Sequence, residues 1–352
     1  MTQKTRSEIP ITTLAPAPVV RDTRARPLRE LRISVIDRCN FRCTYCMPED
    51  SLQGRGVFLP LVKLLTDHEI TDAVRAFVGL GVRKLRITGG EPLVRPGLPG
   101  LLSQLSKIEG VEDIAMTSNG VLLPRLATDL AEAGLSRITV SLDSLDQDVL
   151  DLMSGRKAKL DEILAGIEAA RDAGFRNLKI NTVVQRGVND HTIMDLLSHF
   201  RGSGHTVRLI EFMDVGNSNH WKLEQVVPSA EWVERINKVW PIEAASDSRA
   251  SETARRYRYV DGQGEIGLIS SISQPFCGGC SRARLTADGI LYTCLFANTG
   301  TNLMPLIRQA QDADSLQQKI RDIWERRDDR YSEIRTDLTP STEKVEMYRM
   351  GG

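Results

Sequence analysis

From residue 31 to residue 212, short β-branched and aliphatic segments alternate with amphipathic ones, and this alternation most constrains the fold. Strands are expected at residues 31–36, 84–88, 113–117, 137–142, 177–184 and 207–212, with helices between them. Because strand–helix–strand units place successive strands in parallel with right-handed crossovers, the chain is predicted to form a parallel α/β sheet. The sheet either curls into a partial (β/α)6 TIM-like barrel or stays open and doubly wound.

In both arrangements the functional loops follow the carboxyl ends of the strands. Unusual residues collect at these positions, and we expect them to meet at one site. They are the cysteine stretch 39–46, Gly89-Gly90-Glu91-Pro92, Thr117-Ser118-Asn119-Gly120, Ser141-Leu142-Asp143 and Met213.

The pattern changes after residue 214. A helix is expected at residues 229–239 and another at 315–326, and the turns Asp261-Gly262 and Asp288-Gly289 indicate hairpins. Residues 28–214 are therefore expected to form the partial barrel, and residues 215–352 a smaller C-terminal α+β region. Residues 1–27, rich in proline and basic residues, are predicted to be a disordered extension.

Global charge gives no indication of a nucleic-acid or membrane partner, because 46 basic residues balance 46 acidic ones. An anionic substrate must then be bound by a local basic cluster. No apolar run approaches the ~18 residues of a membrane span. Residues 1–27 lack the apolar core of a signal peptide, so we expect a cytoplasmic protein with reduced cysteines. Metal ligation is then favoured over disulfides.

The first cysteine trio, Cys39, Cys43 and Cys46, follows the first expected strand. Three thiolates on one loop can hold three irons of a [4Fe–4S] cluster, which leaves the fourth iron open to a ligand that is not protein. Structural zinc is the alternative, but it needs a fourth ligand, and His68 is the nearest histidine. The C-x3-C-x2-C spacing, with Tyr45 before the third cysteine, resembles the signature of radical S-adenosylmethionine enzymes.

The second trio, Cys277, Cys280 and Cys294, again provides three ligands without a fourth, which favours a second [4Fe–4S] cluster. A zinc site completed by Asp288 or a similar carboxylate is the alternative. Arg282 and Arg284 lie between these ligands. They form either a solvated strand face or a receptor for phosphates.

Together, the two trios, Cys280-Ser281-Arg282-Ala283-Arg284, Gly89-Gly90-Glu91-Pro92 and the terminal Gly351-Gly352 resemble the molybdenum-cofactor biosynthesis protein A family, GTP 3′,8-cyclase. The likeness runs from about Leu31 to Gly352. The long N-terminal extension departs from the family, and Ser118 stands where threonine is commoner.

The resemblance implies a role for each site residue. Cys39, Cys43 and Cys46 would hold the cluster that binds S-adenosylmethionine, and Cys277, Cys280 and Cys294 would hold the second cluster. The S-adenosylmethionine pocket would contain Tyr45, Gly90, Ser141 and Met213. GTP would be bound by Arg32, Arg86, Thr117, Lys179, Arg282, Ala283 and Arg284, with Arg282 and Arg284 also counted as catalytic.

The resemblance also implies the reaction. The reduced first cluster would cleave S-adenosylmethionine to methionine and a 5′-deoxyadenosyl radical, which removes the ribose 3′ hydrogen of GTP. The C3′ radical would add to guanine C8 and yield 3′,8-cyclo-7,8-dihydro-GTP, in the first step of molybdenum cofactor biosynthesis. The implied partners are an external one-electron donor and the downstream cyclic pyranopterin monophosphate synthase, with a homodimer as a further expectation.

Two other interpretations fit part of the pattern: a radical S-adenosylmethionine enzyme that modifies peptides, and a zinc-bound scaffold without catalysis. The peptide-modifying enzymes usually carry more C-terminal cysteines than the three here. Such enzymes would also not need the terminal Gly-Gly. A frayed end is the ordinary expectation for two glycines, but the resemblance implies that Gly351-Gly352 enters the active site, with Tyr348 and Met350 as apolar anchors outside it.

Overall fold

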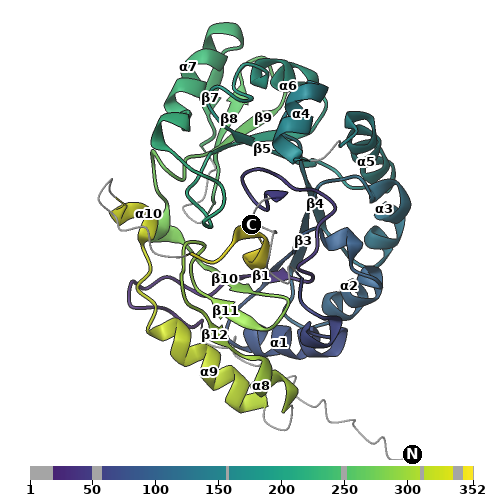
Figure 1. Ribbon diagram of the computed structural model, residues 1–352, viewed down its shortest axis with the longest axis vertical. Helices are drawn as coiled ribbons and strands as arrows, with labels where there is room; N and C mark the ends of the chain where they lie inside the picture. Colours follow the sequence, from purple (N-terminus) through teal and green to yellow (C-terminus); the bar gives the residue numbers. More distant parts are fainter. Residues whose placement is uncertain are drawn as a thin grey trace, which may run out of the picture.

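The computed structural model describes residues 19–49, 58–155, 158–246, 252–309, 313–335 and 344–351. The strands in these ranges form a 12-stranded sheet in the order β12-β11-β10-β1-β2-β3-β4-β5-β6-β9-β8-β7. The eight consecutive strands from β10 to β9 pair in parallel, and an antiparallel hairpin extends each end. The sheet curls around a central space (Figure 1), which confirms the predicted α/β partial barrel.

Six of the parallel strands are those expected from the sequence. They are β1 (Glu30–Ser34), β2 (Lys84–Thr88), β3 (Asp113–Ser118), β4 (Arg137–Ser141), β5 (Lys179–Val184) and β6 (Thr206–Glu211). The remaining six are β7 (Ile242–Ala244), β8 (Arg255–Tyr259), β9 (Glu265–Ile269), β10 (Arg282–Leu285), β11 (Ile290–Tyr292) and β12 (Thr301–Asn302).

The crossover helices cover the outer side of the curved sheet (Figure 1). They are α1 (Asp67–Gly79), α2 (Leu98–Ser106), α3 (Leu123–Glu132), α4 (Gln147–Ser154), α5 (Leu160–Asp172) and α6 (Ile193–Phe200). Helix α1 begins with a capping box, in which Glu69 N donates to Thr66 Oγ1 and Thr66 N donates to Glu69 Oε2. Helix α4 was not predicted from the sequence. Its N-cap, Asp146, accepts bonds from the backbone of Asp148 and Val149.

Alternation along the strands separates an apolar outer face from a polar inner one. In β1, Leu31 and Ile33 are fully buried in the core between sheet and helices, whereas Glu30 and Arg32 lie on the opposite face. The hydrophobic core thus lies outside the barrel wall, and the space inside is left to charged side chains.

The C-terminal region continues the same sheet. Helix α7 (Ser229–Val239) leads into the β8–β9 hairpin, and β9 pairs with β6. The β10–β11 hairpin joins the other edge, where β10 pairs with β1. Both predicted hairpins are confirmed, and the expected boundary after residue 214 falls within one continuous sheet. The chain continues with α8 (Met304–Arg308), α9 (Ala313–Glu325), α10 (Tyr331–Ile334) and α11 (Met347–Met350).

The prediction of a disordered extension through residue 27 is wrong for residues 19–27. Val20, Asp22 and Arg26 are buried, and Arg21 forms a β-bridge with Pro27. The cause is long-range: polar side chains near residue 327 complete the contacts of this segment, and composition alone cannot reveal them. Residues 1–18 lie outside the described ranges.

Within the described part of the chain, no helix combines the length and apolar composition needed to cross a bilayer.

Candidate active site

The first cysteine loop follows β1 and is fixed to the end of α4. Arg42 N donates to the carbonyl of Ser154 (2.8 Å), and Thr44 N donates to that of Met153 (3.0 Å). Gly155 caps α4 in the left-handed conformation (φ 61°), and a Cβ atom added there would overlap the carbonyl of Arg42. The three thiols of this loop are free and half-buried. Three free thiols on one short loop are a donor set that fits a [4Fe–4S] cluster.

The Gly-Gly-Glu-Pro loop after β2 packs directly on the cysteine loop. Gly90 N donates to Ile36 O (2.7 Å), and Glu91 N donates to Arg38 O (2.8 Å). A Cβ atom added at Gly90 would overlap the carbonyl of Arg38. Position 90 therefore needs glycine because two backbones meet there.

Glu91 connects this loop to the one after β3. Its carboxylate accepts bonds from Ser118 Oγ and Asn119 N, both at 2.8 Å, and Asn119 Nδ2 donates to Asn40 Oδ1 at 2.7 Å. Burial raises the pKa of Glu91 to about 7, although these donors act in the opposite direction. The prediction that the cysteine, Gly-Gly-Glu-Pro and Thr117–Gly120 loops meet is confirmed.

The loop after β4 meets the cysteine loop through Tyr45, whose hydroxyl donates to Asp143 Oδ2 (2.8 Å). Val183 N donates to the other oxygen of the same carboxylate (2.9 Å). Burial raises the pKa of Asp143 to about 6. Tyr45 thus joins the cysteine loop to the loop that follows β4, the strand that ends at Ser141.

Inside the curved sheet lies a cavity of about 170 Å³. Nine of the predicted site residues line it: Arg32, Arg86, Thr117, Met213, Cys277, Cys280, Arg282, Arg284 and Cys294. Tyr45, Gly90, Ser141, Lys179 and Ala283 are not among the lining residues, so their contacts with a ligand stay predictions. Ala283 is fully buried in the hydrophobic core, because its side chain points away from those of its arginine neighbours.

Strand register explains why the cavity is rich in arginine. Arg32 is aligned with Arg284 on β10 and with Arg86 on β2, so their side chains emerge on the same inner face. Burial and the neighbouring guanidinium groups lower the pKa of Arg32 well below its ordinary value. Glu30 is the compensating charge. Burial would raise its pKa, but Arg32, Arg86 and Arg282 lower it to about 2.

Sequence reasoning missed other lining residues, including Arg208, Asn181 and Arg327. Arg208 Nε donates to Asn181 Oδ1 (2.9 Å), and burial lowers the pKa of Arg208 to about 9. A signal existed for Arg208, which lies between the apolar residues Val207 and Leu209 of β6. No local signal marks Arg327, which follows the C-terminal end of α9.

The second trio is placed among cationic donors. Arg282 Nη2 and Arg327 Nη2 donate to Cys280 Sγ at 3.4 and 3.3 Å. Burial would raise the pKa of Cys280, but these two charges lower it to about 6. A thiol that ionises readily beside two other free cysteines fits metal ligation.

The zinc alternative finds less support in the geometry. Across the described ranges, no three His, Cys, Asp or Glu side chains converge as ligands of a single metal ion. Asp288, the suggested completing ligand, instead accepts bonds from Thr286 Oγ1 and Arg349 Nη2.

The C-terminal tail enters the barrel (Figure 1). Arg284 Nη1 donates to the carbonyl of Gly351 (2.8 Å), and a Cβ atom added at Gly351 would overlap Thr88 Oγ1. Met350 is fully buried next to it, as expected of an apolar anchor, and is not among the residues that line the cavity. Tyr348 is half-buried, and Gly352 lies outside the described residues.

Comparison with known proteins first defines the class. Residues 33–200 match the Radical SAM superfamily, and residues 205–333 match Molybdenum Cofactor Synthesis C. Among solved structures, Streptococcus suis SuiB bound to S-adenosylmethionine is similar in fold, with a TM-score of 0.58 at 17% identity. That similarity covers 84% of this chain and 68% of SuiB. The fold and the cysteine loop are thus those of the radical S-adenosylmethionine class.

Curated relatives then give the family. The GTP 3′,8-cyclase of Xanthomonas campestris pv. campestris is 49% identical over 339 residues, which cover 96% of this chain and 99% of the relative. That of Acidothermus cellulolyticus is 49% identical, covering 90% and 88%, and that of Staphylococcus carnosus is 45% identical, covering 95% and 99%. The chain belongs to the GTP 3′,8-cyclase family.

The contact at position 90 gives a prediction. Gly90→Ala should displace the cysteine loop, because the added methyl group meets backbone that cannot move away cheaply. We expect iron and acid-labile sulfide at the first trio to fall severalfold after anaerobic reconstitution. Gly100→Ala is the matched control, since that α2 glycine has open space around it and should be neutral or slightly stabilising. Equal iron content in the two variants would contradict the packing argument.

Proposed function

We propose that this chain converts GTP to 3′,8-cyclo-7,8-dihydro-GTP, the first step of molybdenum cofactor biosynthesis. In this proposal the first trio holds a [4Fe–4S] cluster, the second trio holds another, and GTP occupies the cavity beside the second. With S-adenosylmethionine bound, the first cluster supplies a 5′-deoxyadenosyl radical that removes a hydrogen atom from the ribose. Tyr45, Gly90, Ser141 and Met213 would line the S-adenosylmethionine pocket.

The observation that carries the proposal is the charge of the cavity. Six arginines and two carboxylates line it, an excess of four positive charges over these groups. A nucleoside triphosphate carries a charge of about −4, and buried cations are costly unless paired with an anion or a metal ligand. The named relatives are GTP cyclases, and a cavity with this charge suits their substrate.

Different arginines would contact different parts of GTP. Arg282 and Arg284 already have partners at Cys280 and at the tail, which favours positions close to the guanine and ribose. Arg32, Arg86 and Arg208, with Thr117, come from β1, β2, β6 and β3 and would bind the phosphates, and Lys179 of β5 would add a further positive charge. Burial and nearby arginines lower the pKa of Lys179 to about 8, and a bound phosphate would raise that pKa again. Ala283 would contribute through its backbone.

The chain's remaining task is orientation and exclusion of water, because a carbon radical must meet one intended partner. The inserted tail and the curved sheet would enclose the nucleotide. An external one-electron donor, a downstream cyclic pyranopterin monophosphate synthase, a homodimer and a cytoplasmic location complete the proposal.

The cysteine trios provide the direct test. Replacing Cys39, Cys43 or Cys46 with serine should abolish reductive cleavage of S-adenosylmethionine, since a hydroxyl is a poor iron ligand. Replacing Cys277, Cys280 or Cys294 should spare much of that cleavage without GTP while eliminating the cyclised product. Both reactions are measured by quantifying 5′-deoxyadenosine and cyclised nucleotide. Equal loss of cleavage in both sets would refute the division of labour.

A second prediction concerns the phosphates. Arg208→Gln should weaken GTP binding about ten- to a hundredfold, because a charge-assisted contact contributes roughly 1.5–3 kcal/mol. Binding of guanosine, which lacks phosphates, should be unchanged. Arg255→Gln, at an exposed position on β8, is the control and should alter neither affinity. If Arg208→Gln weakens both ligands equally, this arginine does not contact phosphate.

A third prediction concerns the tail. Gly351→Ala and deletion of Gly351-Gly352 should both remove productive cyclisation while leaving the iron content and thermal stability nearly unchanged. The alanine methyl group cannot fit beside Thr88, so the tail must withdraw from Arg284. A synthetic peptide matching the last residues should restore part of the activity of the truncated protein. Full activity in both variants would show that the tail is dispensable.

A further inference from the structure

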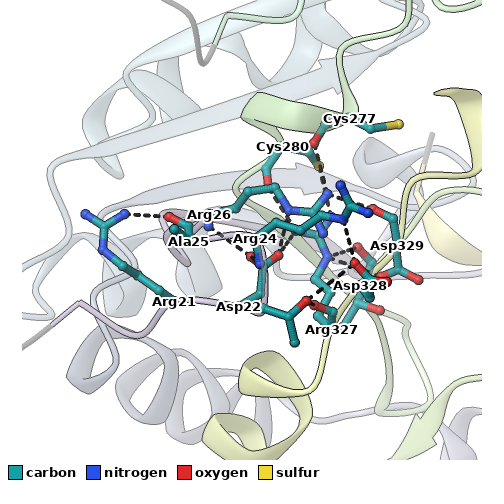
Figure 2. A network of polar contacts seen from close by, with 12 residues as sticks. Arg21, Asp22, Arg24, Ala25, Arg26, Cys277, Cys280, Arg327, Asp328 and Asp329 are labelled. Atoms are coloured by element: carbon teal, nitrogen blue, oxygen red, sulfur yellow. Dashed lines mark hydrogen bonds and ion pairs between the residues drawn. The ribbon is translucent and has the colours of Figure 1, made fainter.

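A buried network of opposite charges lies behind the second cysteine trio (Figure 2). Its centre is Asp22, in the segment where the sequence had predicted disorder. The Asp22 side chain is fully buried, and those of Arg26 and Arg327 are 2% and 1% exposed. The two arginines come from opposite ends of the chain.

Each oxygen of the Asp22 carboxylate accepts two hydrogen bonds. Its Oδ2 accepts bonds from Arg26 Nε (2.6 Å) and Arg327 Nη1 (3.1 Å). Its Oδ1 accepts bonds from the backbone N–H groups of Arg24 and Arg26, at 3.0 and 2.9 Å. One carboxylate therefore fixes both guanidinium groups and the local turn of residues 22–26.

The two arginines reach all three segments of the trio. Arg26 Nη1 donates to the carbonyl of Cys277 (2.9 Å), and Arg327 Nη1 donates to that of Cys280 (2.9 Å). Arg327 Nε donates to the carbonyl of Thr293, the residue before Cys294 (3.1 Å). Arg327 Nη2 also contacts the Cys280 thiol. Figure 2 shows both guanidinium groups directed toward Cys277 and Cys280.

A cluster whose only role was to hold the fold together would not require buried charged side chains. Burying ions costs desolvation free energy, and a well-packed apolar cluster of similar size is often at least as stable. What charges add is a fixed electric field and donors of fixed direction. The reduction potential of an iron–sulfur centre depends on the charge and the hydrogen bonds around its sulfurs.

We propose that Asp22, Arg26 and Arg327 are positioning residues that set the geometry and the reduction potential of the second cluster. The inference rests on the proposed function, because it presupposes an iron–sulfur cluster at Cys277, Cys280 and Cys294. Residues 19–27 then belong to the active-site architecture. Arg327 acts directly on a cysteine ligand, Arg26 acts through a carbonyl, and Asp22 acts only through the two arginines.

The test compares Asp22→Asn with Arg26→Gln in the full-length, anaerobically reconstituted protein. Iron content and electron paramagnetic resonance report which cluster is present, and a redox titration gives the potential of each. Asp22→Asn removes a negative charge and should raise the potential of the second cluster, whereas Arg26→Gln removes a positive charge and should lower it. The first cluster should keep its potential and its cleavage of S-adenosylmethionine in both variants.

Asp328→Asn is the matched control. Asp328 is next to Arg327 in sequence and pairs with Arg24 of the same N-terminal segment, but its side chain is 65% exposed. An exposed ion pair contributes little, so iron content and both potentials should match wild type. The double variant Asp22→Asn/Arg26→Gln removes one charge of each sign and should bring the second potential back toward wild type.

Loss of iron confined to the second cluster, from about eight to about four irons per chain, would also support the proposal where a single variant cannot retain that cluster. Shifts of the same sign in both single variants, or unchanged occupancy and potential, would overturn it. Loss of both clusters in the single and double variants would also overturn it, because the network would then be structural. A wild-type protein that binds only about four irons would instead refute the second cluster of the proposed function itself, and this inference with it.

Discussion

The pairing of β10 with β1 is the contact on which the rest of the site depends. It brings a strand from the last quarter of the chain to the first strand of the barrel, in a register that aligns Arg284 with Arg32 and Arg282 with Glu30. The second cysteine trio precedes and follows β10, so the same pairing places those thiols at the cavity. Without it, the two trios would belong to separate parts of the protein.

Charge burial then determines what the cavity can accept. Arginines on the inner face lose water without gaining enough acidic partners, which is why burial lowers the pKa of Arg32, Arg86 and Arg208. Glu30 compensates part of this charge, and its own pKa falls to about 2 as a result. The remaining repulsion between these arginines lowers the stability of the folded protein locally. An anionic ligand would reduce that repulsion.

Local patterns were sufficient for much of this molecule. Short β-branched and aliphatic segments located β1 to β6, and Asp–Gly turns located both hairpins. Sequence spacing also divided the cysteines into two trios, one after β1 and one on either side of the β10–β11 hairpin. The residues that it missed depend on distant partners. Arg327 and Asp22 have no periodic or motif signal, and their role exists only because the fold brings the two ends of the chain together.

Both ends of the described chain in fact return to the same region. Residues 19–27 contact the second trio through the Asp22 network. The tail enters the barrel, where the carbonyl of Gly351 accepts a hydrogen bond from Arg284. The tail is also fixed along its length, because Lys344 Nζ donates to Asp214 Oδ2 (2.8 Å) and Ser218 Oγ donates to Glu346 Oε1 (3.1 Å). Such contacts restrict the tail before any ligand arrives, so less conformational entropy is lost when the nucleotide is enclosed. A site for a reactive radical is thereby bounded by chain ends that are held in place by ion pairs and hydrogen bonds.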